Sequence, residues 1–189
     1  MASLWLGVLL FGGTHVFSLL MPAHRNGLKA RWGEKRYMGI YSLVSLAGLV
    51  LLGFGYVAGR GDVAAANLYE PWAGARHIMM LLVLVGFILI FSNKNGGYIS
   101  RTLHHPFSIG VALWSLGHLL VNGEPAVVVI YGLFLALSLL DIFLGFARGK
   151  WATHVPNIRG DIRSVVVGLV LFAVFAFGFH PYVLQIPVM

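Results

Sequence analysis

The chain has 189 residues, of which 59% are hydrophobic and only 10% are charged. A soluble domain averages roughly 45–50% apolar and about 25% charged residues, so this composition excludes an ordinary soluble fold. The formal net charge of +7 does not indicate a nucleic-acid partner, because the basic residues lie in short segments between apolar blocks, where membrane proteins carry them.

The apolar residues fall in six blocks of about 17–23 residues, each about the length of an α-helix that crosses a hydrocarbon core of roughly 30 Å. We therefore predict an all-α, polytopic integral membrane protein, a six-transmembrane-helix bundle that forms a single domain over residues 1–189. Breakers mark the helix ends: Pro22 follows the first helix, and the run Asn93–Gly97 follows the third. In chain order, the predicted helices are Leu4–Met21, Met38–Ala58, His77–Ser92, Pro106 to about Asn122, Pro125–Ala147 and Ser164–Phe179.

The distribution of charge predicts the orientation of these helices. Eleven of the 13 Lys and Arg residues lie in the first, third and fifth connections, and only Arg60 and Arg76 lie on the opposite side. Positive loops stay in the cytoplasm, so we expect both termini outside, which in a bacterium is the periplasmic side of the inner membrane. The first block lacks the basic start of a signal peptide, because no Lys or Arg precedes Arg25.

His15 is an ionisable residue inside the first predicted helix. Such residues are costly in lipid and indicate a functional site. The small residues Gly12, Gly13 and Ser18 beside it leave room for a flat, bulky group to approach the helix. A structural interpretation stays open, in which a neutral His15 hydrogen-bonds to a neighbouring helix and the glycines serve close helix packing.

His118 is the second histidine that lies well inside a predicted helix. Gly110, Trp114 and His118 recur every four residues and therefore share one face of that helix, which Ser115 adjoins. A small residue, an aromatic ring and an imidazole on one face can line a cofactor pocket. The alternative is again a hydrogen-bonded contact between helices.

Two histidines on separate helices can hold a cofactor, because neutral imidazole is the commonest metal ligand and bundles build cofactor sites from facing side chains. Zinc or di-iron centres would lack ligands, since the chain has no cysteine and few carboxylates inside the predicted helices. A haem needs only two axial imidazoles and an apolar slot. His15 and His118 differ in predicted depth by roughly 14 Å, so His77 and His180 are reserve ligands.

Three further groups of polar residues lie near the predicted helix ends. Asp141 either reaches the cytoplasmic interface or pairs with a loop arginine, or it orients a histidine. The pair His104–His105, with Arg101 one turn earlier, lies beside a helix N-terminus and can bind an anion, as can Arg76–His77. Haem propionates are the natural anion for either cluster. The alternative for both clusters is that they mark only the start of a helix at the interface between membrane and water.

Two groups of motifs carry a resemblance to a known family. The motif residues are Gly33–Tyr37, Tyr41–Ser45, His105–Pro106, Gly110, Leu113–Trp114 and His118. With these residues at these spacings, the chain resembles the NnrU family of bacterial membrane proteins over nearly its whole length. The resemblance implies a role in nitrite and nitric oxide reduction during denitrification, with the lipid bilayer and components of the nitrite or nitric oxide reductases as partners.

The NnrU family is in turn similar to plant cis-zeta-carotene isomerase, a membrane enzyme that uses haem b. The axial histidines of that enzyme lie in its first helix and in a Trp-Cys-Leu-Ala-His segment, which correspond here to His15 and to Trp114–His118. The resemblance therefore implies a haem b cofactor with His15 and His118 as iron ligands. Ser115 stands in place of the cysteine and cannot supply that soft ligand. The residues expected around the cofactor are Gly12, Arg76, His77, Trp114 and Ser115.

Two other functions stay open at this point. His105–Pro106 followed by Gly110 also resembles the S-adenosylmethionine-binding segment of small membrane methyltransferases. The arginine usual before that motif is His104 here, however, and the segment Arg148–Thr153 has no glutamate. A non-catalytic assembly or signalling protein would use its histidines only for packing. Whether the protein is an enzyme is open from the sequence; a haem protein would be coloured, whereas the alternatives would be colourless.

Overall fold

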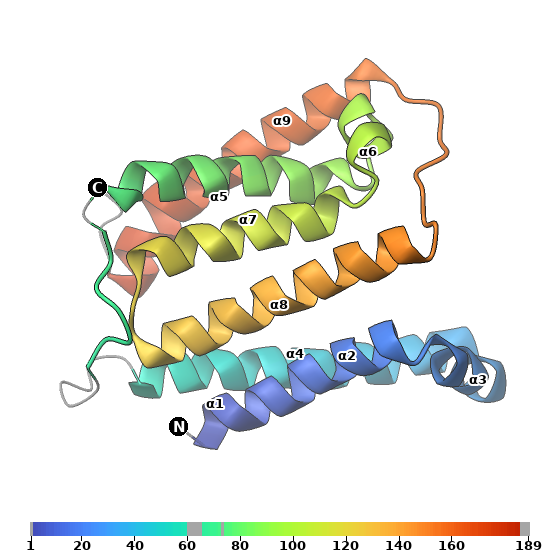
Figure 1. The fold of residues 1–189 in the computed structure, drawn as a ribbon, viewed down its shortest axis with the longest axis horizontal. Helices are drawn as coiled ribbons and strands as arrows, with labels where there is room; N and C mark the ends of the chain where they lie inside the picture. The colour runs from blue at the N-terminus through green and yellow to red at the C-terminus, as the bar shows by residue number, and fades with distance from the viewer. Residues whose placement is uncertain (1, 60–65, 73, 186–189) are drawn as a thin grey trace. The chain divides into compact units, whose positions relative to one another are not determined.

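The computed structural model describes residues 2–59, 66–72 and 74–185. All regular secondary structure of these residues is helical (Figure 1), which confirms the all-α prediction. The chain divides into two compact units. Unit 1 consists of Met1–Glu70 and Asn122–Leu140, and unit 2 consists of Pro71–Val121 and Asp141–Met189.

Unit 1 begins with a helical run of three elements and continues with two further helices. They are α1 (Ala2–Gly7), the π-helical η1 (Val8–Gly12), α2 (Gly13–Leu20), α3 (Pro22–Trp32) and α4 (Glu34–Gly59). Unit 2 contains α5 (Ala75–Ser92), α6 (Tyr98–Leu103), α7 (Pro106–Val121), α9 (Ile158–Ala173) and the π-helical η2 (Val174–Leu184). The remaining helix, α8 (Pro125–Ala147), contributes to both units, because the chain divides within it.

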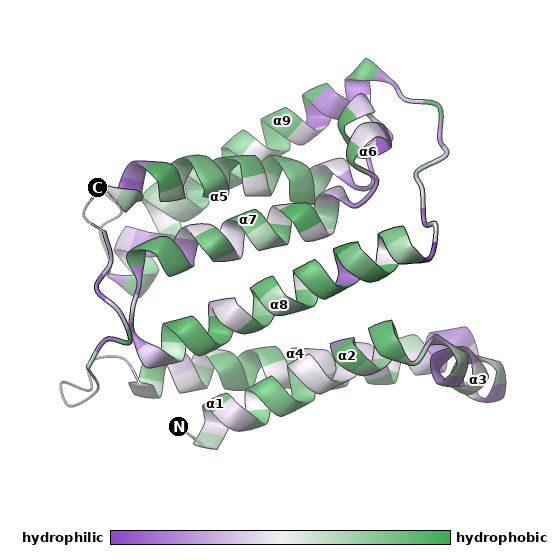
Figure 2. Ribbon diagram, in the orientation of Figure 1, coloured by the Kyte–Doolittle hydropathy of each residue, from purple (hydrophilic) through white to green (hydrophobic). Residues whose placement is uncertain are grey.

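Five helical runs in the described part of the chain are long and apolar enough to cross a membrane, which gives the chain the character of a membrane protein. These runs are Ala2–Leu20, Glu34–Gly59, Ala75–Ser92, Pro125–Ala147 and Ile158–Leu184. The remaining predicted span corresponds to α7, an apolar helix of 16 residues. Figure 2 shows the apolar colour along these helices and the hydrophilic colour on much of α3.

The predicted helix bounds agree best where a proline starts the helix. Both α7 and α8 begin at the predicted prolines, which are favoured in a first turn. Two predicted starts are wrong: α4 begins at Glu34 rather than at Met38, and α9 begins at Ile158 rather than at Ser164. The first turns of both helices carry charged residues, which a search for apolar blocks does not detect.

The first connection contains a helix of its own, α3. It begins at Pro22 after Met21, whose φ of −117° and ψ of 56° break the preceding helix. It ends at Gly33, whose φ of +82° is accessible to glycine but strained for other residues. This helix is not among the runs that are long and apolar enough to cross a membrane. It leaves α2 in a new direction (Figure 1).

Glycines let the first helical run approach α4 closely in unit 1. A methyl group on Gly48 would lie 2.5 Å from the backbone nitrogen of Phe11, and one on Gly55 would lie 2.7 Å from Cα of Leu4. Small residues allow such close approach in membranes, where packing rather than the hydrophobic effect drives helix association. The buried cluster of this unit consists of Leu4, Leu52 and Ala126.

Unit 2 is built around α5, against which α7 and α9 both pack (Figure 1). A methyl group on Gly110 of α7 would lie 2.6 Å from the carbonyl oxygen of Gly86 on α5. One on Gly168 of α9 would lie 2.6 Å from the side chain of Ile88, also on α5. The glycines of these helices therefore hold the positions at which their axes come closest.

Hydrogen bonds join the third connection to the end of the fifth connection and to the first turns of α9; Nδ2 of Asn157 donates to the carbonyl oxygen of Gly96 at 3.0 Å. The carboxylate of Asp161 accepts the backbone N–H groups of Tyr98 and Ile99, at 2.9 and 3.1 Å, at the start of α6. The Nδ2 of Asn95 donates to Oγ of Ser164 at 3.0 Å. The two connections therefore lie on the same side of any bilayer that unit 2 spans, as the predicted topology requires.

Candidate functional site

His15 lies on α2 and is half-buried. Its Nδ1 lies 2.7 Å from the carbonyl oxygen of Phe11, and because a carbonyl can only accept, Nδ1 carries the proton. The lone pair of the neutral ring is then on Nε2. Among the described residues, the ring of His15 makes no other hydrogen bond. His15 thus bonds to its own helical run. The structural alternative predicted from the sequence is instead a bond to a neighbouring helix.

A row of aromatic rings surrounds His15 in unit 1. The ring of Phe11 stacks on His15 with centroids 4.2 Å apart, and the ring of Tyr41 lies 5.5 Å from it on the other helix, α4. Tyr41 in turn stacks on the buried Tyr37 at 6.2 Å. The imidazole of His15 is therefore packed between an aromatic ring of its own helical run and one of α4.

The two glycines before His15 have different surroundings. The side chain of Leu133 on α8 lies against Gly12, 3.0 Å from the position of a methyl group there. No described atom lies within 4 Å of the same position on Gly13. Gly12 therefore serves helix packing, whereas the open surface is at Gly13, which is two residues before His15 and lies on another side of the helix.

His118 lies on α7 in unit 2 and has the same local geometry as His15. Its Nδ1 donates to the carbonyl oxygen of Trp114 at 2.8 Å, again four residues earlier. The rings of Trp114 and His118 lie 5.1 Å apart, so the two residues share a face as predicted. In both histidines, an i−4 backbone bond therefore selects the tautomer with its lone pair on Nε2.

His180 is the second histidine of this region of unit 2. Its ring lies 6.2 Å from that of His118, with an angle of 26° between the ring planes. Its Nδ1 donates to the carbonyl oxygen of Phe175, five residues earlier, because the wider turn of the π-helix η2 brings those two groups together. The predicted last helix ends at Phe179, one residue before His180, and the prediction includes His180 only as a reserve ligand near the outer face.

The small residues of α7 serve mainly to pack this helix. Gly110 faces α5, and a methyl group on Gly117 would lie 3.2 Å from the carbonyl oxygen of Met79, which is also on α5. Ser115 is completely buried, and its hydroxyl has no hydrogen-bond partner among the described residues. Ser115 is therefore inside the fold rather than on an open surface beside His118.

The predicted anion clusters differ in their exposure. Arg76 and His77 are both exposed at the start of α5. The Nδ1 of His104 accepts the backbone N–H of Ala152 at 3.2 Å, and its ring meets Trp151 edge-on. The His104–His105 pair is therefore engaged by the protein, whereas Arg76–His77 is accessible.

Asp141 has a partner that sequence reasoning missed. Its carboxylate accepts the hydroxyl of Ser108 on α7. One turn before Ser108, the ring of His105 lies on Gly145, where a methyl group would be 2.3 Å from its Cε1. The Nε2 of His105 is buried and has no partner among the described residues. Asp141 therefore belongs to a polar contact between α7 and the end of α8.

The described residues contain no group of three or more His, Cys, Asp or Glu side chains placed to hold a metal ion. A site built from protein ligands alone, such as a zinc or di-iron centre, therefore lacks its donor set in this part of the chain. A metal that brings its own equatorial ligands needs only one or two imidazoles.

Comparison with known proteins adds one decisive finding. The model of the NnrU protein family matches residues 3–188. The chain belongs to the NnrU family. No curated protein and no solved structure matches it.

The motifs that carried the NnrU resemblance form the surroundings of the two histidines. Gly33 makes the turn into α4, and Tyr37 and Tyr41 on that helix form the aromatic row that reaches His15. The second motif lies on α7, where Gly110 packs on α5 and Trp114 accepts the bond from His118. In this NnrU protein, each motif therefore supports one candidate ligand.

Proposed function

We propose that this NnrU protein binds haem b in the membrane, with His15 and His118 as the axial ligands. The observation that supports this most is the shared geometry of the two histidines, whose Nδ1 atoms donate to i−4 carbonyls at 2.7 and 2.8 Å. Histidines that bind metals are commonly held in this way, because the bond fixes the tautomer and orients Nε2 towards the metal.

The chemistry of the available donors fits haem better than another metal centre. Both candidates are neutral imidazoles in apolar helices, and the chain has no cysteine. Arg76 and His77 are accessible to a propionate. When bound, haem b supplies one-electron redox chemistry, while the protein's part is to bind and orient it.

His180 has the role of a positioning residue in this proposal. Its ring contacts that of His118, and the bond from its own Nδ1 to Phe175 holds it in place. A ring held there limits the rotation of His118. His180 therefore supports the ligand rather than replacing it.

We further propose six spans, with α7 as the sixth, and both termini on the periplasmic side of the bacterial inner membrane. A helix of 16 residues is close to the lower limit of about 17 residues for a span. The excess of basic residues in the first, third and fifth connections supports this orientation. The hydrogen bonds between the third and fifth connections agree with it.

The family membership supports a role in denitrification, with components of the nitrite or nitric oxide reductases as partners. An optical spectrum of the detergent-purified protein, oxidised and reduced, tests the proposal. A haem protein with two imidazole ligands shows a Soret band and sharp low-spin bands on reduction. A colourless protein that remains colourless after addition of haemin contradicts the proposal. Binding of S-adenosylmethionine to such a protein would favour the methyltransferase alternative.

A further inference from the structure

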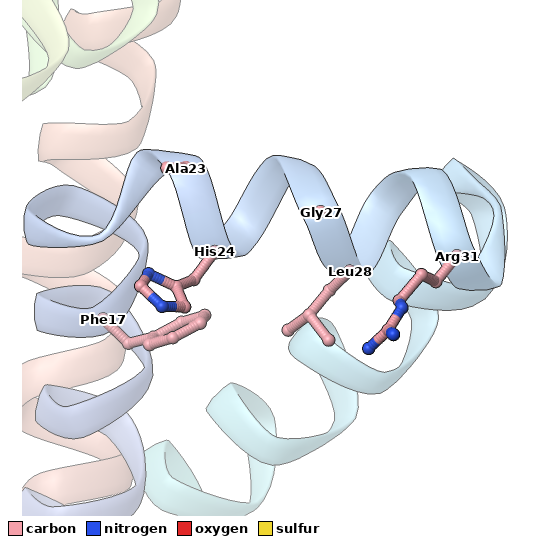
Figure 3. Close-up of a pocket in the computed structure, with 6 residues that line it drawn as sticks. All are labelled: Phe17, Ala23, His24, Gly27, Leu28 and Arg31. Carbon is pink, nitrogen blue, oxygen red and sulfur yellow. The ribbon is translucent and has the colours of Figure 1, made fainter.

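A cavity of about 590 Å³ lies in the corner between α2 and α3 in unit 1 (Figure 3). The corner exists because Met21 and Pro22 end one helix and begin the next in a new direction. The residues that line the cavity are Phe17 on α2 and Ala23, His24, Gly27, Leu28 and Arg31 on α3.

The lining of this corner cavity is mostly apolar, with His24 beside Phe17 at one end and Arg31 at the other end (Figure 3). His24, Leu28 and Arg31 are spaced four and three residues apart and therefore share one face of α3. Figure 3 shows their side chains extending from α3 to the side on which Phe17 lies. Arg31 makes no hydrogen bond or ion pair with the described residues, so its guanidinium is available to a ligand.

The position of the cavity matches the boundary of a bilayer. It adjoins α2, the end of an apolar run long enough to span. Met21 and Trp32, at the two ends of α3, are exposed by 42% and 44%, and exposed tryptophan is typical of the membrane interface. The basic residues of this region are Arg25, Lys29, Arg31, Lys35 and Arg36, with Glu34 as the only acidic residue. Glu34 is already paired with Lys29 at 3.0 Å.

We propose that the corner cavity binds one anionic phospholipid of the surrounding bilayer. Arg31 holds the headgroup phosphate, because a guanidinium matches phosphate oxygens with two parallel donors. The acyl chains lie along Phe17 and Leu28. The net positive charge of α3 selects an anionic headgroup over a zwitterionic one, as basic pockets beside membrane helices do. The apolar lining of the cavity, which includes Phe17 and Leu28, favours a lipid over a free phosphate ion. This site is independent of the proposed haem.

Lipid titration of the delipidated full-length protein in detergent tests the proposal, with retained lipid counted by native mass spectrometry. Phosphatidylglycerol should remain bound as one molecule and raise the unfolding temperature. Phosphatidylcholine and inorganic phosphate at the same concentrations should do neither. Equal retention of the two lipids, or equal stabilisation by inorganic phosphate, would overturn the proposal.

Two substitutions that each remove one positive charge test where the lipid binds. Arg31→Gln should weaken phosphatidylglycerol binding about tenfold, the size expected for a lost hydrogen bond to a charged group. Arg36→Gln, outside the cavity, should change it little. Arg31→Lys, which keeps the charge and loses the two-donor geometry, should recover part of the affinity. The helical circular dichroism of each variant checks its fold. If Arg31→Gln and Arg36→Gln have equal effects, the lipid binds by general charge attraction and the proposed site is wrong.

Discussion

His118 and His180 lie ring against ring in unit 2, with their centroids 6.2 Å apart. The contact depends on the π-helical η2, which continues through Pro181 and carries His180 beyond the predicted end of its helix. A ligand histidine held by a second ring has little freedom to rotate. In this unit the rings of both Trp114 and His180 therefore pack against the proposed ligand.

Substitution of His180 tests whether it positions the ligand. His180→Ala should retain low-spin haem, because His15 and His118 remain, but should shift the reduction potential more than His24→Ala, whose side chain is exposed on α3. Potentiometric titration of the reduced bands measures both shifts. Complete loss of haem from a folded His180→Ala variant would show instead that His180 is an iron ligand.

Asp161 should contribute strongly to the stability of unit 2. Asp161→Ala removes the acceptor of two backbone N–H groups and should cost about 2–4 kcal/mol, since bonds to a charged group contribute about 1.5–3 kcal/mol each. Glu34→Ala, which removes an exposed ion pair, should cost less than about 1 kcal/mol. Denaturant unfolding in detergent compares the two. Equal costs would mean that the Asp161 bonds do not hold the two connections together.

Two glycines of α4 provide a matched test of helix packing in unit 1. Gly48→Ala should destabilise the protein by about 1–3 kcal/mol, because its methyl group would overlap the backbone of Phe11. Gly53→Ala has no described atom within 4 Å of its methyl group and should be neutral or stabilising by up to about 1 kcal/mol, since alanine favours helix. Thermal unfolding measures both, and a neutral Gly48→Ala would contradict the close approach of α4 to the first helical run.

Reporter fusions test the proposed topology. A fusion at Gly96, in the third connection, should report the cytoplasm, and one after the C-terminus should report the periplasm. The reason is the excess of basic residues on the side of Gly96. Fusions that report the same compartment would mean that the last helical run does not cross the membrane or that α7 and α8 are not both spans.

The apolar pattern predicts the apolar helices well, because each is a long apolar block with a clear breaker near its end. It does not predict α3, in which basic residues interrupt the apolar pattern, or the charged first turns of α4 and α9. Local signals begin two of these segments: Pro22 stands in the first turn of α3, and the side chain of Asn157 caps α9.

The candidate site was predictable only in part. His15 and His118 are recognisable from the sequence, because burying an imidazole in an apolar helix costs free energy and therefore indicates a functional site. The contact between His118 and His180 depends on a π-helical turn, and no apolar period predicts one. The bond of Ser108 to Asp141 and the contact of Leu133 with Gly12 each depend on the register of two packed helices. The register between two packed helices cannot be predicted from a single sequence.

The most direct test of haem ligation is the optical spectrum of His15→Ala and His118→Ala, each purified with haem and compared with His77→Ala. We expect each of the first two variants to lose haem or to become high-spin while its helical circular dichroism persists. His77→Ala should keep the low-spin spectrum of the unsubstituted protein. A low-spin spectrum that survives both His15→Ala and His118→Ala would contradict the proposal and assign the iron to other residues.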